Sequence, residues 1–382
     1  MDVRRREGSE SRHDAPFMTR ALEPVHFEDL AGFNADDACA ALAAFVVSAR
    51  ALCGGAVSTR PARGVSPRLI AIAGDALAIK LEDGAAARRF FVDRFQPFRV
   101  RSDAADGAGF LTGYYEPFVK GSLTRTAAFA GRILARPRDL VTFPFGEAPE
   151  GVDDGLTGAQ RLASGGLRPY PERAAIEAGE GEAILWLEDA VEVFLAQVQG
   201  SARVELPDGR QVRLAYDGRN GRPYTSIGRL LIEAGEIAEC DMSLARLKRW
   251  LRDNGLGAGD KGLALMQRNQ SYVFFKREEA FDPALGPTGG AGVPLTPLRS
   301  IAVDRSIWAY GTPFWIDAEL PWRDESVSPF RRLMIAQDTG SAILGSARAD
   351  IFFGGGEAAG ARAGAIRQRA TFTVLLPRGD EP

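Results

Sequence analysis

Glycine and proline divide this chain into short segments, and this spacing limits the fold more than any other feature. The sequence has 43 glycines and 22 prolines among 382 residues, a content typical of many turns and short strands rather than long helices. After a Gly/Pro-rich connection at residues 281–293, short alternating apolar runs occur at residues 298–302, 313–316, 332–336 and 370–376. Runs of this length favour a small closed barrel over a doubly wound sheet.

Two apolar segments near the N-terminus predict helices at residues 36–53 and 84–97. We expect Asn34 or Asp36 near the N-cap of the first helix and Gly54 just after its end. Residues 1–25 are charged and unpatterned and are expected to be disordered.

A hairpin and two capped helices are expected farther along the chain. Residues 203–206 and 211–216 flank an Asp-Gly turn, which predicts a β-hairpin. Ser226 and Ser243 each precede an apolar-periodic segment and are predicted to be N-caps. Residues 272–275 have a β-rich composition.

The histidine and cysteine content disfavours several enzyme classes. The two histidines, His13 and His26, lie in a polar N-terminal stretch, whereas nucleophilic triads need an imidazole within the active site. Zinc enzymes usually draw on several His or Cys ligands. Cys39, Cys53 and Cys240 form no CxxC pair, give no disulfide framework, and are expected to be small buried apolar residues. We therefore expect no metal and no cofactor, and Asp or Glu as the acid-base groups.

Charge and hydropathy indicate a globular protein. The chain is 45% apolar and 25% charged, with a net charge of -3, so nucleic-acid binding, which needs a concentrated basic face, is not expected. No run approaches the ~20 apolar residues of a membrane span. Arg4-Arg5-Arg6 is not followed by an apolar core, and Leu52 before Cys53 is unlike a lipoprotein cleavage site. No signal peptide or lipobox is visible.

Three aspartates near the C-terminus carry the densest chemistry of the sequence. Asp304, Asp338 and Asp350 each lie beside short apolar β-type residues. Carboxylates at strand ends are well placed for acid-base catalysis, because a barrel holds them rigidly. Aspartates at such positions also commonly cap turns, so the pattern alone leaves both interpretations open.

Five segments in one order resemble a known family. They are Gly113-Tyr-Tyr-Glu-Pro, Gln197-Val-Gln-Gly-Ser, Tyr224-Thr-Ser-Ile-Gly with Gly235-Glu-Ile, Asn269-Gln-Ser-Tyr-Val-Phe-Phe, and the three-aspartate stretch. Together they resemble the membrane-bound lytic murein transglycosylase A family, whose C-terminal part is a three-aspartate (3D) domain. The resemblance covers about residues 110–378.

The resemblance implies a mainly β protein with a few helices. It implies a double-psi β-barrel domain formed by residues 26–118 and 279–382, and a smaller β-rich substrate-binding domain inserted at residues 119–278. A groove between the two would hold a glycan strand. The implied partner is peptidoglycan, and the implied location is the cell envelope: the periplasm, with outer-membrane association allowed. Association with other cell-wall enzymes is also allowed.

The implied activity is non-hydrolytic cleavage of the β-1,4 bond between N-acetylmuramic acid and N-acetylglucosamine, forming 1,6-anhydromuramic acid ends. The family's catalytic acid matches Asp350, and Asp338 and Asp304 match supporting aspartates. Ser341 departs from the glycine that relatives often carry, with little effect expected. The expected substrate-binding residues are Tyr114, Tyr115, Gln199, Gly200, Ser201, Tyr224, Ser226, Asn269, Gly340 and Ser341.

Two alternatives remain open from the sequence. The first is a hydrolytic muramidase on the same scaffold, in which Asp338 or Asp304 activates a water molecule and Asp350 is the acid. The second is a non-catalytic peptidoglycan-binding protein, which would not need the acid. Product analysis separates the three.

Overall fold

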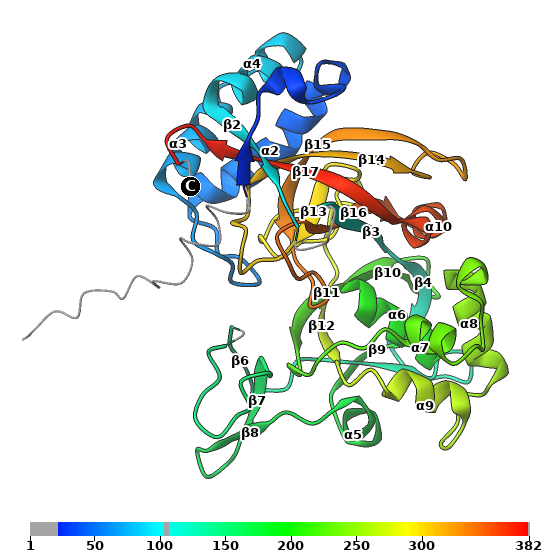
Figure 1. Ribbon diagram of the computed structural model, residues 1–382. Helices are drawn as coiled ribbons and strands as arrows, with labels where there is room; N and C mark the ends of the chain where they lie inside the picture. The colour runs from blue at the N-terminus through cyan, green and yellow to red at the C-terminus, as the bar shows by residue number, and fades with distance from the viewer. Residues whose placement is uncertain (1–21, 103–106, 145, 381–382) are drawn as a thin grey trace, which may run out of the picture.

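The computed structural model describes residues 22–102, 107–144 and 146–380. Six strands pair around a closed ring (Figure 1). In order around the ring they are β3 (Gly109–Glu116), β17 (Arg367–Pro377), β14 (Pro313–Leu320), β15 (Ser328–Asp338), β13 (Ser300–Val303) and β16 (Arg348–Gly355). The β13–β15 and β16–β3 pairs are parallel and the other pairs are antiparallel. The closed barrel expected from the short apolar runs is confirmed.

Alternation along the barrel strands sorts side chains into two layers. On β14, Phe314 and Ile316 belong to the cluster inside the barrel, whereas Trp315 belongs to a second cluster outside it. On β15, Met334 lies in the inner cluster and Ile335 in the outer one. Both faces of these strands are therefore buried, which explains why the runs are almost continuously apolar.

Three helices cover the outer face and pack on the outer cluster: α2 (Ala38–Gly54), α3 (Pro67–Ala76) and α4 (Gly84–Arg94). The first predicted helix is confirmed, but its cap is Asp37, whose side chain accepts a bond from the Ala40 N–H. Asp36 instead forms an ion pair with buried Arg299 at 2.7 Å. Gly54 belongs to the helix, which Gly55 ends in a left-handed conformation (φ 65).

The other N-terminal expectations are corrected in part. The second predicted helix ends at Arg94 rather than 97, because Phe95 begins strand β2 (Phe95–Val100), which pairs with β17. Residues 1–21 of the expected disordered stretch lie outside the described residues. Strand β1 (Leu22–Pro24) pairs with β2, so the expectation is wrong for residues 22–24.

A second sheet lies beside the barrel, in the lower part of Figure 1. Its strand order is β12 (Val273–Glu278), β11 (Gln211–Arg219), β10 (Ser201–Glu205), β4 (Phe118–Ser122), β9 (Ala183–Leu187) and β5 (Gly131–Leu134). The predicted hairpin is confirmed as β10 and β11. A smaller sheet contains β6 (Leu140–Thr142), β7 (Gly158–Arg161) and β8 (Leu167–Pro169).

Helix α6 (Ala190–Gln199) packs against this second sheet. Helices α7 (Ile227–Glu233), α8 (Leu244–Asp253) and α9 (Lys261–Gln267) pack with α6 in a separate apolar cluster, and the short helix α5 (Arg173–Ala178) follows β8 along the chain. Both predicted serine caps are confirmed, because Ser226 accepts from the Arg229 N–H and Ser243 accepts from the Arg246 N–H. Short 3-10 turns occur at Phe27–Asp29, Phe33–Ala35 and Glu239–Asp241.

One buried ion cluster marks the passage of the chain from the barrel to the second sheet. β3 ends at Glu116, which is 1% exposed, and β4 begins at Phe118. The Glu116 carboxylate accepts bonds from Arg213 Nε at 2.6 Å and from Arg203 Nη2 at 3.1 Å. Because both arginines lie in the second sheet, this carboxylate links the barrel to the second sheet at the point where the chain passes from one to the other.

Two further expectations need correction. The three cysteines are free, but none is fully buried: Cys39 is half-buried, and Cys53 and Cys240 are exposed, because they lie at a helix end and in a 3-10 turn. The glycine-rich stretch at residues 354–360 predicts a turn, but it includes the end of β16 and the start of helix α10 (Glu357–Ala365). Helix α10 is rich in alanine and glycine and lacks a strong apolar periodicity, so the sequence pattern did not predict it.

Candidate functional site

Asp350 is held on one side only. It lies near the start of β16, with its side chain 19% exposed. Its Oδ1 accepts hydrogen bonds from Thr112 Oγ1 on β3 and from Arg348 Nη1 at 2.5 Å. Arg348 Nη2 also donates to Thr112 Oγ1 at 2.8 Å, which closes a three-membered network. Among the described residues, Oδ2 has no hydrogen-bond donor, so one carboxylate oxygen is fixed and the other is free.

The parallel register of β16 and β3 creates this network. Asp350 is opposite Thr112, and Arg348 is opposite Phe110. Residues two apart on a strand share a face, so Arg348 and Asp350 point the same way. Tyr114, two residues after Thr112, extends the row, and its ring packs on Phe352 with centroids 5.3 Å apart.

Asp338, at the end of β15, is 8% exposed and has both oxygens occupied. Oδ1 accepts from the Gly290 N–H at 2.7 Å, and Oδ2 accepts from the Tyr114 hydroxyl at 3.0 Å. Burial raises the pKa of Tyr114 well above its ordinary value, and the negative charges of Asp338 and Asp350 act in the same direction. The Tyr114 hydroxyl therefore stays protonated and donates a hydrogen bond to Asp338, within reach of the charge of Asp350.

Asp304 has the contacts of a structural cap. It is 6% exposed, and its Oδ1 accepts from the N–H and hydroxyl of Ser306 at 3.0 and 2.6 Å. Its Oδ2 accepts from the Gly345 N–H at 2.8 Å. The side chain thus fixes the turn after β13 to the loop that leads into β16.

Tyr224, in the loop before α7, is close enough to Asp350 for the charge of that aspartate to affect its pKa. Burial raises the pKa of Tyr224, whereas its bond with Ser226 lowers it and the charge of Asp350 raises it. The backbone next to Tyr224 is fixed by Asn269, whose Oδ1 accepts from the Thr225 N–H at 3.1 Å and from the Ser271 N–H at 3.3 Å. Asn269 is itself 2% exposed, so it fixes the backbone around Thr225 from the interior of the protein.

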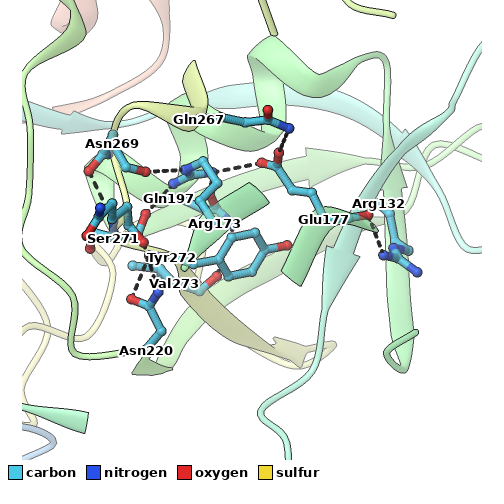
Figure 2. A network of polar contacts seen from close by, with 11 residues as sticks. Arg132, Arg173, Glu177, Gln197, Asn220, Gln267, Asn269, Ser271, Tyr272 and Val273 are labelled. Atoms are coloured by element: carbon cyan, nitrogen blue, oxygen red, sulfur yellow. Dashed lines mark hydrogen bonds and ion pairs between the residues drawn. The ribbon is translucent and has the colours of Figure 1, made fainter. Parts of the chain in front are cut away.

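Figure 2 shows the polar network that holds Asn269 in place. Buried Arg173 donates from Nε to the Asn269 carbonyl at 2.8 Å and from Nη1 to Gln197 Oε1 at 2.6 Å. Gln197 Nε2 donates to the Val273 carbonyl at 3.1 Å. Two of the quoted sequence motifs, those starting at Gln197 and Asn269, therefore meet in one network of structural bonds.

The Gln199-Gly200-Ser201 turn lies where α6 meets β10. Gln199 Oε1 accepts from the Tyr115 N–H at 3.1 Å, so this side chain bridges to the barrel strand β3. Gly200 is left-handed (φ 81), and Ser201 is 8% exposed. The Tyr115 ring packs in the barrel core, 8% exposed, and offers little surface to a ligand.

The remaining expected residues lie in the loop after β15. Gly340 accepts from the Ile343 N–H at 3.1 Å in a turn, and Ser341 is exposed beside it. Within the described ranges, no group of three or more His, Cys, Asp or Glu side chains could hold a metal ion. His26 is exposed, and His13 lies outside the described residues.

Sequence reasoning missed three residues of the site. Arg348 had a signal, because it lies two residues before Asp350 and residues two apart on a strand share a face. Thr112 had none by itself, since only the β16–β3 register brings it to Asp350. Arg60, in the connection between α2 and α3, donates to the Thr339 carbonyl beside Asp338, and no local pattern distinguishes it.

Comparison with known proteins shows which family has this architecture. Residues 110–276 match the family description "MltA specific insert domain", and residues 299–376 match "3D domain". A solved membrane-bound lytic murein transglycosylase from Agrobacterium tumefaciens has a TM-score of 0.82 at 34% identity, covering 94% of this chain and 98% of that one. This chain belongs to the membrane-bound lytic murein transglycosylase A family.

Two curated members of that family show the extent of the likeness. Membrane-bound lytic murein transglycosylase A of Escherichia coli K12 is 32% identical over 288 residues, 72% of this chain and 67% of its own. The protein of that name from Vibrio cholerae serotype O1 is 36% identical over 189 residues, about half (49%) of each chain. The family resemblance drawn from the five motifs is confirmed. None of the helices in the described part of the chain combines the length and the apolar character of a membrane-spanning segment.

Proposed function

We propose that this protein is a lytic transglycosylase that cleaves peptidoglycan glycan strands with Asp350 as its single acid and base. The observation that carries the proposal is the one-sided anchoring of Asp350. Thr112 and Arg348 fix Oδ1, while Oδ2 has no donor among the described residues. A carboxyl group with one fixed and one free oxygen has a defined orientation and can still exchange a proton with a substrate.

In the proposed reaction, protonated Asp350 gives its Oδ2 proton to the glycosidic oxygen that leaves with N-acetylglucosamine. The bond between C1 of N-acetylmuramic acid and that oxygen breaks. The C6 hydroxyl of the same muramyl residue attacks C1, and its proton passes to Asp350 Oδ2. Intramolecular attack has a large proximity advantage, so the nucleophile needs no second carboxylate. The products are a free N-acetylglucosamine hydroxyl and a 1,6-anhydro ring.

The bonding of the other two aspartates favours this reaction over hydrolysis by a muramidase. A water-activating base needs a free carboxylate oxygen within reach of the water. Both oxygens of Asp338 and both oxygens of Asp304 already accept hydrogen bonds from protein donors. We therefore propose that Asp338 orients Tyr114 and that Asp304 fixes the loop before β16.

We propose that the glycan lies between the barrel and the second sheet. Tyr224, beside the Thr225 backbone that Asn269 fixes, and Tyr114, which donates to Asp338, are the two tyrosines near enough to Asp350 for its charge to affect their pKa. Gln199, Gly200, Ser201, Ser226, Gly340 and Ser341 complete the proposed binding surface, Gln199 with its amide N–H₂ and Ser341 with an exposed hydroxyl.

The proposed domain boundaries are 26–118 with 279–382 for the barrel domain and 119–278 for the inserted domain. Support comes from the step at Pro117, where the chain leaves β3 for β4. We further propose a location in the cell envelope, in the periplasm and against the outer membrane. The substrate and the "membrane-bound" name of the relatives support this location, as they do contact with other cell-wall enzymes.

Mass spectrometry of muropeptides released from purified sacculi tests the reaction. We expect wild type to release anhydro-muropeptides, which are one water lighter than reducing-end products, and Asp350→Ala to release none. Asp317→Asn is the matched control, because Asp317 is a barrel-strand carboxylate paired with Arg331 on β15 rather than with β16; it should retain activity. Reducing-end products from wild type would establish a muramidase, and binding to sacculi without release would establish a binder.

A further inference from the structure

Arg60 is fixed beside the Asp338 end of the site by its own main chain. Its N–H donates to the Gly290 carbonyl at 3.2 Å, and the hydroxyl of the preceding Thr59 donates to the Gly289 carbonyl at 3.0 Å. Gly290 is also the residue whose N–H binds Asp338. The connection between α2 and α3 therefore delivers this arginine to the same turn that holds Asp338.

The Arg60 guanidinium spans from the barrel to the second sheet. Its Nη1 donates to the Thr339 carbonyl, and its Cζ lies 4.0 Å from the ring centroid of Tyr216 on β11. Its Nη2 points to Gly200, where an added Cβ would lie 3.6 Å away. Gly200 belongs to the turn between α6 and β10, so the arginine faces a segment already proposed to contact glycan.

Most donors of this arginine are unused. Within the described ranges, Nε is buried without a partner, Nη2 has no acceptor, and no carboxylate forms an ion pair with the guanidinium. Burial alone would lower the pKa of Arg60, but the charges of Asp338, Tyr216 and Tyr310 outweigh burial and raise it. The Tyr310 hydroxyl is likewise buried without a partner. A buried charged donor without an acceptor is costly, and an oxygen of a bound ligand or of a water molecule supplies such an acceptor.

We propose that Arg60 binds the oxygen acceptor of the 3-O-lactyl group of a muramyl residue and thereby selects muramyl glycan over chitin-type glycan; this inference rests on the proposed function. Acetamido groups and hydroxyls occur on both sugars of the strand, whereas the lactyl group occurs only on N-acetylmuramic acid. Its acceptor is a carboxylate in bare glycan and an amide carbonyl where a peptide stem is attached. The planar guanidinium fork matches a carboxylate geometrically and pairs with it in two parallel bonds.

The test is a binding measurement, so that it does not depend on turnover. Calorimetric titration in the Asp350→Asn background compares three hexasaccharides: chitohexaose, bare alternating muramyl glycan, and the same glycan with its lactyl carboxyls amidated by L-alanine. Arg60→Met removes the donors and keeps an unbranched apolar stem, and Arg60→Lys keeps the charge without the planar fork. Arg63→Met is the matched control, because Arg63 is an exposed arginine of the same connection.

We expect Arg60→Met to weaken binding of the muramyl hexasaccharides by about 10- to 150-fold, the range of a charged hydrogen bond, and binding of chitohexaose by less than about threefold. Arg60→Lys should lie between, and Arg63→Met should match the parent. A larger loss for bare than for amidated glycan identifies the carboxylate as the acceptor, and equal losses identify the carbonyl. An equal loss for chitohexaose and muramyl glycan, or no loss for either, overturns the proposal. A parent protein that binds none of the three sugars overturns the proposed function as well.

Discussion

Replacing Thr112 by valine removes one hydroxyl and nearly nothing else, which makes it a sharp test of how Asp350 is held. The Thr112 hydroxyl donates to Asp350 Oδ1 and accepts from Arg348 Nη2 at 2.8 Å. Valine keeps the β-branched shape that strand β3 accommodates. Asp350 would then retain one of its two donors, and Arg348 would lose the acceptor that fixes its second nitrogen.

The expected size follows from one hydrogen bond to a charged group, about 1.5–3 kcal/mol. At about 1.4 kcal/mol per tenfold change in rate, full loss of that orientation lowers kcat by roughly 10- to 150-fold. Thr112→Ser, which keeps the hydroxyl, should stay within about threefold of wild type. The assay is the initial rate of anhydro-muropeptide release, with chitohexaose binding measured in parallel to show an intact site. A valine variant that keeps wild-type kcat would refute the proposed role of the network.

Three further outcomes are expected. Asn269→Ala leaves the Thr225 and Ser271 N–H groups without a partner; we expect about 2–4 kcal/mol lower unfolding free energy in urea and weaker glycan binding, and unchanged stability would contradict the structural role. Asp304→Asn should lower Tm but leave kcat within about threefold of wild type, whereas an inactive, fully folded variant would make Asp304 catalytic. Burial raises the pKa of Tyr272 to about 12, so its folded pKa exceeds its unfolded value; its stabilisation is complete below pH ~10 and is lost as pH rises toward 12. Tyr272→Phe should therefore flatten the fall in unfolding free energy in that window, by up to about 1.4 kcal/mol per pH unit, and an unchanged slope would argue against it.

Features set by a few neighbouring residues were predictable from the sequence. The Asp-Gly hairpin and the serine caps at Ser226 and Ser243 depend on local turn and capping chemistry, which a single sequence displays. Helix α6 was not predicted, because seven of its ten residues are buried and it shows no single apolar face. Helix α10 was mistaken for a turn because of its glycines.

The same distinction, between local and long-range features, holds for the residues of the site. Asp350 was found through its motif, and Arg348 was available through the two-residue period of a strand. Thr112 reaches Asp350 through strand register across 238 positions, and Arg60 reaches Thr339 across 279. Contacts of that range depend on the closed ring of strands and on the connection between α2 and α3, which carries Arg60 to Thr339. Local periodicity in the sequence does not encode either of them.

The single free oxygen of Asp350 has a consequence for where protons come from. In the proposed reaction Oδ2 releases a proton to the leaving oxygen and regains one from the C6 hydroxyl of the same sugar. The carboxyl group is thus recharged by its own substrate at the end of every cycle. The proton that opens one glycosidic bond is the one taken from the C6 hydroxyl in the preceding cut, and successive cuts along a strand require neither water nor a proton from the bulk solvent.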